Sequence, residues 1–95
     1  MSDMTEPFKP VRTQIVAYTG TAGTIGNFTG AGINVVRVVT TSIAHIAFGT
    51  APTATTNDIY MPANVPEYFI ISPGSKISAI QVAAGGNLHV TEMSR

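Results

Sequence analysis

The side chains that could act as general bases or bind a metal are few. His45 and His89 are the only histidines, the chain has no cysteine, and Asp58, Glu67 and Glu92 are the acids that could orient a catalytic histidine. His89 and Glu92 lie three residues apart in a segment with strand-like alternation, so we expect them on opposite faces of a strand. A metal site needs three or four converging ligands. We therefore predict no catalytic residue, no metal site, no cofactor and no enzymatic activity, and interpret His45 as a hydrogen-bonded interior or interface residue and His89 as a surface residue.

Three glycines, Gly20, Gly23 and Gly26, recur at a spacing that invites comparison with a phosphate-binding loop. The segment lacks the Lys-Ser/Thr pair of a P-loop and does not match the dinucleotide-binding spacing. It also opens no helix whose N-terminus could hold an anion. We interpret these glycines as serving backbone flexibility or close packing on a neighbouring element.

The charge balance excludes several classes of partner. Of the 95 residues 11% are charged, and five basic and five acidic side chains cancel to zero, whereas soluble domains carry about 25% charged residues. Binding to nucleic acid needs clustered Lys and Arg, and here the cations are scattered. No stretch approaches the roughly 18 uninterrupted apolar residues of a membrane span, and the N-terminus does not resemble a signal peptide. We expect a soluble, unsecreted protein with neither nucleic acid nor membrane as a partner.

The charged residues gather at the ends of the chain. Between residues 13 and 57 the only charged side chain is Arg37, whereas the first twelve residues hold four charges and two prolines. Proline fixes its own φ and favours extended backbone in the residue before it. We therefore divide the chain into an extended N-terminal arm, residues 1–12, and a single domain, residues 13–95.

The domain has the composition of an all-β fold. Segments rich in β-branched and aromatic residues predict strands at 11–19, 35–39, 43–48, 59–61, 67–72, 76–83 and 88–92. Residues 20–34 are predicted to form a long mobile loop or a broken hairpin, and turn residues at 73–75 and 84–87 predict two consecutive hairpins. The alternation in the last strand predicts Leu88 and Val90 inward, with His89 and Thr91 outward. The fold class is all-β: a single small β-sandwich, or a partly open barrel, of about 6–8 short antiparallel strands.

A neutral all-β surface with exposed strand edges favours assembly into a symmetric oligomer. Arg37, inside Val-Val-Arg-Val-Val, either points to solvent or bridges to a carboxylate on a neighbouring subunit. The aromatic residues Phe28, Tyr60, Tyr68 and Phe69 are either core residues or a sugar-stacking platform. We predict that Arg37, Tyr60 and Tyr68 form contacts between subunits.

Four blocks between residues 35 and 93 carry a resemblance to a known group of proteins. They read AFGTAPTATT (47–56), MPANVPEYF (61–69), ISPGSKISAIQ (71–81) and LHVTEM (88–93). These blocks resemble small β-rich virion proteins of tailed bacteriophages, among them head decoration or cement proteins. Residues 1–12 and 20–34 lie outside the resemblance, which carries no catalytic residue with it.

The resemblance implies a jelly-roll-like sandwich that forms homotrimers and binds the major capsid protein. The protein would be made in the cytoplasm of the host bacterium and located on the outer capsid surface of the virion. Its arm, through Phe8, Lys9, Val11 and Arg12, would then contact the capsid protein. Two alternatives remain open at this point: a tail or head–tail adaptor that attaches fibres, and a module that binds carbohydrate or the host surface.

Overall fold

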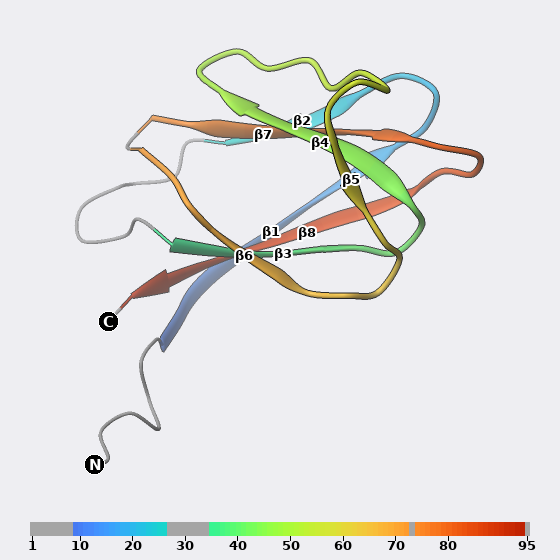
Figure 1. The fold of residues 1–95 in the computed structure, drawn as a ribbon. Coiled ribbons are helices and arrows are strands. Elements are labelled where there is room, and N and C mark those ends of the chain that lie inside the picture. The colour runs from blue at the N-terminus through green and yellow to red at the C-terminus, as the bar shows by residue number, and fades with distance from the viewer. Residues whose placement is uncertain (1–8, 27–34, 73, 95) are drawn as a thin grey trace.

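The computed structural model describes residues 9–26, 35–72 and 74–94, which form a two-layered β structure (Figure 1). The strands are β1 (Lys9–Tyr18), β2 (Gly23–Ile25), β3 (Val35–Thr40), β4 (Ala44–Gly49), β5 (Ile59–Met61), β6 (Glu67–Ile70), β7 (Lys76–Gln81) and β8 (Gly86–Ser94). These described ranges contain no helix, and hence none long enough to cross a membrane. The predicted all-β class is confirmed.

The strands form two four-stranded antiparallel sheets, which we call sheet A (order β1-β8-β3-β6) and sheet B (order β2-β7-β4-β5). Each strand of the first half of the chain pairs with its counterpart counted from the end: β1 with β8, β2 with β7, β3 with β6 and β4 with β5. The chain is thus one long antiparallel hairpin, with β4 and β5 at its tip, wrapped into two layers. This is the jelly-roll form of the β-sandwich.

The two predicted hairpins near the C-terminus are wrong. β6, β7 and β8 follow one another in the chain, but β7 belongs to sheet B while β6 and β8 belong to sheet A. The chain therefore changes sheet between β6 and β7 and again between β7 and β8, instead of returning to a hydrogen-bonded neighbour. Turn residues mark where the chain reverses, but they do not determine which layer the next strand enters.

The predicted long loop also contains a strand. Residues 23–25 form β2 and pair antiparallel with β7. A three-residue strand that includes a glycine has too little pattern to be recognised from the sequence. The rest of that prediction, residues 27–34, lies outside the described residues.

The core lies between the inner faces of the two sheets. The predicted alternation in β8 is confirmed, because Leu88 and Val90 are fully buried while His89 and Thr91 are on the opposite face. The buried apolar cluster consists of Tyr18, Val36, Val38, Ala44, Ile46, Met61, Ile71, Ile77, Ala79, Leu88 and Val90. Both sheets contribute to it, so burial of this cluster holds the two layers together.

Sheet A begins earlier in the chain than the predicted domain boundary. Lys9 already pairs with Ser94 and Arg12 with Glu92, with an irregularity in register between Pro10 and Arg12. Residues 9–12, assigned to the arm from the sequence, therefore form the first part of β1. A proline is compatible with this position because β1 is an edge strand. Residues 1–8 of the predicted arm lie outside the described residues.

Candidate functional site

One lateral side of the sandwich, formed by β1 and β2, is closed by the main chain. After β1 the chain crosses from sheet A to sheet B, and the Gln81 N–H donates to the Thr19 carbonyl at 3.0 Å. β2 lies so close to β1 that a Cβ on Gly23 would stand 2.2 Å from the Ala17 carbonyl oxygen. A Cβ on Gly26 would meet the Lys76 side chain at 2.1 Å. The predicted role of these two glycines in close packing is confirmed.

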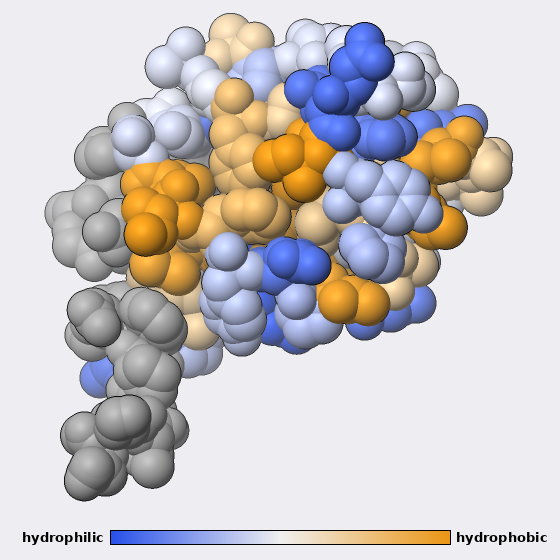
Figure 2. All heavy atoms as spheres, viewed as in Figure 1, coloured by the Kyte–Doolittle hydropathy of each residue, from blue (hydrophilic) through white to orange (hydrophobic). Residues whose placement is uncertain are grey.

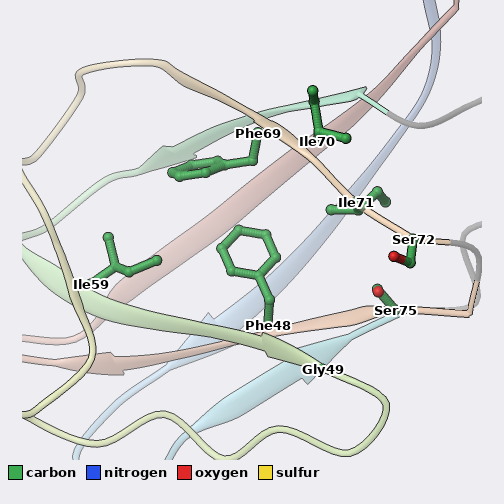
Figure 3. Close-up of a pocket in the computed structure, with 8 residues that line it drawn as sticks. All are labelled: Phe48, Gly49, Ile59, Phe69, Ile70, Ile71, Ser72 and Ser75. Atoms are coloured by element: carbon green, nitrogen blue, oxygen red, sulfur yellow. The ribbon is translucent and has the colours of Figure 1, made fainter.

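The opposite side, bounded by the edge strands β5 and β6, is open and contains a pocket of about 280 Å³ (Figure 3). Phe48 of sheet B and Phe69 of sheet A meet across it, with ring centroids 5.0 Å apart. The lining residues are Phe48, Gly49, Ile59, Phe69, Ile70, Ile71, Ser72 and Ser75. Beyond one end of the open side, the Asn64 N–H donates to the Thr40 carbonyl at 2.7 Å and ties the β5–β6 connection to β3. On this side, therefore, the apolar residues that lie between the two layers are only partly covered by the described chain.

The chemistry of this pocket is that of a contact site for apolar groups. Its lining contains five apolar side chains, two serines and no charged residue. Figure 2, which views this side, shows apolar residues gathered in the left and middle of the molecule. Ile70 is 81% exposed and its side chain points away from Phe48, towards the outer face of sheet A (Figure 3). Burial of such groups against another protein is favourable because it removes apolar area from water.

The outer face of sheet A is the second surface of note. Cross-strand pairing aligns Ile15, His89 and Val39 in one row of this face, and Thr13, Thr91 and Arg37 in the next. Arg37 is the single charged residue that β3 and β8 present there. Valines on β3 thus occupy both faces of the strand, so the outer face of sheet A carries apolar side chains as well as the core face.

The predicted contact residues Tyr60 and Tyr68 are both 56% exposed but lie on different sheets. Tyr68 lies on the outer face of sheet A, directly opposite Arg37 of β3. Tyr60 lies on the outer face of sheet B, where its ring contacts His45 edge-on at a centroid distance of 5.7 Å. Phe69 points inward, so these three aromatic rings do not share one stacking platform. Phe28, the fourth, lies outside the described residues.

The predicted capsid-contact residues of the arm are used in part by the domain itself. Arg12 forms an ion pair with Glu92, with Nη2 and Nε at 2.6 and 2.7 Å from Oε2. Glu92 is 1% exposed, so this carboxylate is buried on the inner face of β8. Lys9 and Val11 are exposed on β1, whereas Phe8 lies outside the described residues. The ion pair joins the two ends of the chain, and sequence reasoning missed it because only the strand register reveals it.

The two histidines lie on different sheets. His45 Nδ1 lies 3.0 Å from the carbonyl oxygen of Asp58, in agreement with its predicted hydrogen bond, and His89 is on the outer face of sheet A. The loop 50–58 covers part of sheet B, where the Ala54 N–H donates to the buried Oγ of Ser78 at 2.9 Å. Within the described ranges, no three His, Asp or Glu residues come together as metal ligands.

Comparison of the chain with protein families, curated proteins and solved structures found no match. Its function is therefore inferred from its surfaces together with the sequence resemblance.

Proposed function

We propose that the protein is a non-enzymatic structural protein of a tailed-bacteriophage virion, a head decoration or cement protein. It binds the lattice of the major capsid protein at the outer capsid surface and stabilises it. The observation that carries this proposal is the outer face of sheet A, which combines Ile15, Val35 and Val39 with uncharged threonines around one central Arg37. The four blocks that resemble small virion proteins supply the class of partner.

A face of this composition suits binding to another protein because little charge has to be desolvated. Contact interfaces of standard size bury about 1,600 Å² in total, and charged residues are depleted at their centres. Burial of the valine and isoleucine side chains removes apolar surface from water and so favours binding. The hydroxyl groups of Thr13 and Thr91 already hydrogen-bond each other at 3.0 Å. Arg37 is the group that would pair with a carboxylate of the capsid protein.

The N-terminal segment supplies the second part of the proposed contact. Val11 stands at the irregularity in β1, is 52% exposed and lies beside exposed Lys9. Together with Phe8 these residues would extend the contact from the sheet along the capsid surface. Arg12 is a weaker candidate for this contact than the sequence indicates, because Glu92 binds its guanidinium group.

The proposal is tested by adding the purified protein to capsids that lack it and measuring occupancy. Ile15→Lys places a charge on the outer face of sheet A at a residue that is 57% exposed, so the fold should be retained. Thr56→Lys, on the exposed loop over sheet B, is the matched control. We expect occupancy to fall about tenfold or more for Ile15→Lys and to be unchanged for Thr56→Lys. Equal occupancy of the two variants would contradict the proposed face.

The contribution of the N-terminal segment is measured in the same assay. Deletion of residues 1–8 stops short of Lys9 and therefore leaves all the pairs of β1 with β8 in place. We expect the truncated protein to fold with unchanged melting temperature and to lose occupancy. Full occupancy of the truncated protein would refute a role for this segment.

A further inference from the structure

The edge strand β6 is the starting point, because it differs from the opposite edge of the same sheet. β1 carries Lys9, Pro10, a register irregularity and Arg12, all of which hinder pairing with a further strand. β6 begins with Glu67 and continues with three uncharged residues, Tyr-Phe-Ile, without a proline. On one side it pairs with β3, and on its other side no described strand pairs with it. Among the described strands, sheet A thus has one edge that is protected against further pairing and one that is not.

We propose that β6 pairs antiparallel with β6 of a second copy of this chain, across a two-fold axis at Phe69. In this register Tyr68 of each copy stands opposite Ile70 of the other on the outer face of the sheet, and Phe69 stands opposite Phe69 on the inner face. Tyr68 and Ile70 are 56% and 81% exposed in the single chain. Pairs of an aromatic with a β-branched residue are among the stabilising cross-strand pairs. In this register, outward-facing residues pair with outward-facing residues and inward-facing with inward-facing. The buried faces of both sheets therefore remain on the same side.

The apolar residues of β6 select this register. With the axis at Phe69 the residues Tyr68, Phe69 and Ile70 pair only with one another, and each Glu67 stands at the outer end of the paired strands, opposite Ile71. A shift that places the axis at Tyr68 would set Glu67 opposite Phe69 in the middle of the contact and Ile70 opposite Pro66, which has no N–H to donate. A shift that places it at Ile70 would pair Tyr68 with Ser72, two residues beyond the end of the strand. The central register is therefore the one that joins the three apolar residues of both copies.

The same pairing closes the open side of the sandwich. A strand added at the free edge of β6 extends sheet A across the opening, with its inward side chains directed towards the pocket beside Phe48 and Ile59 (Figure 3). Two sheets A would become one continuous eight-stranded sheet, and their outer faces one continuous surface. Because a two-fold contact uses the same patch on both copies, it produces a dimer, and not the homotrimer that the sequence resemblance implies. The inference does not depend on a virion location, since the dimer would form from the isolated protein.

The first test measures the mass of the purified protein by sedimentation equilibrium, across roughly micromolar to millimolar concentrations. We expect a concentration-dependent dimer. Ile70→Lys should raise its dissociation constant about tenfold or more, because each dimer contains the change twice. Thr56→Lys, on the exposed loop over sheet B, is the matched control and should dimerise like the parent protein. A protein that stays monomeric, a trimer, or an equal response of the two variants would overturn the proposal.

A cross-linking experiment tests the register. The chain has no cysteine, so the double variant Tyr68→Cys/Ile70→Cys introduces the only thiols. Directly opposite residues of antiparallel strands have Cβ atoms about 4.5–5.5 Å apart, close to disulfide geometry, whereas residues two apart in one strand are too distant. We expect a covalent dimer on mild oxidation, and none from Val11→Cys/Ile15→Cys. Both variants change exposed residues, so folding is verified by circular dichroism, and a folded Tyr68→Cys/Ile70→Cys protein that stays monomeric would exclude the register.

Discussion

The buried ion pair between Arg12 and Glu92 offers a quantitative test of how the two ends of the chain are held together. Glu92 is 1% exposed and lies on the inner face of β8, where Val36 of β3 stands opposite it. Arg12 reaches it from β1 with two nitrogen atoms within 2.7 Å of the same carboxylate oxygen. We predict that Arg12→Met destabilises the fold, because it leaves a buried carboxylate without its cation.

The expected size follows from the geometry. Loss of one partner of a fully buried pair costs about 3–5 kcal/mol. The Arg12 side chain is 46% exposed, so water can approach the remaining carboxylate and reduce the loss. We therefore expect a decrease of about 2–3 kcal/mol in the free energy of unfolding, which corresponds to a fall of roughly 10–20 °C in Tm for a domain of this size.

The assay is thermal and urea unfolding followed by circular dichroism at neutral pH. The double variant Arg12→Met/Glu92→Leu removes both charges and should recover at least half of the lost stability, since an apolar pair replaces an orphaned charge. The same Arg12→Met protein, kept below its Tm, should still occupy capsids. If Arg12→Met unfolds like the parent protein and instead loses occupancy, Arg12 acts on the partner and the structural role assigned to it is refuted.

Three further changes test the contacts that shape the sandwich. Tyr18→Phe removes the buried hydroxyl that donates to the Ser42 carbonyl and accepts from its N–H, and should cost about 1–3 kcal/mol in urea unfolding. Gly23→Ala forces a Cβ against the main chain of β1 on the closed side and should cost roughly 2 kcal/mol or more, whereas an unchanged midpoint would show that this side is not tightly closed. Ser78→Ala leaves the buried N–H of Ala54 without its acceptor and should speed amide exchange in the loop 50–58, with β8 as the unaffected internal reference.

The side-chain alternation of the strands could be predicted from the sequence because each strand carries its own pattern. β8 alternates between Leu88 or Val90 on the buried face and His89 or Thr91 on the other. The pattern is local, and a sheet with one buried face forces it on the strand whatever its neighbours are. The topology is not local. The jelly-roll pairing of β1 with β8 joins residues about eighty positions apart, and no short-range signal reports it.

The candidate surfaces were only partly predictable for the same reason. The exposure of Tyr60 and Tyr68 is compatible with the predicted contacts. Their separation onto different sheets follows from the topology, which places β5 in sheet B and β6 in sheet A. The predicted strands contain both Phe48 and Phe69. The pocket between them could not be predicted, because it forms only when β4 and β6 lie in facing layers. Arg12 illustrates the limit most clearly, since a charge near the N-terminus indicates a contact but not whether its partner is internal.

The central claim, that this chain is a capsid decoration protein, is tested most directly by its copy number on purified phage particles. Quantitative mass spectrometry of phage particles purified from a lysate that contains this chain would give its ratio to the major capsid protein. The proposed function predicts hundreds of copies per particle, in a fixed ratio to the capsid protein. About a dozen copies would instead indicate the head–tail adaptor or another tail component, and absence from the particle would contradict the virion assignment altogether.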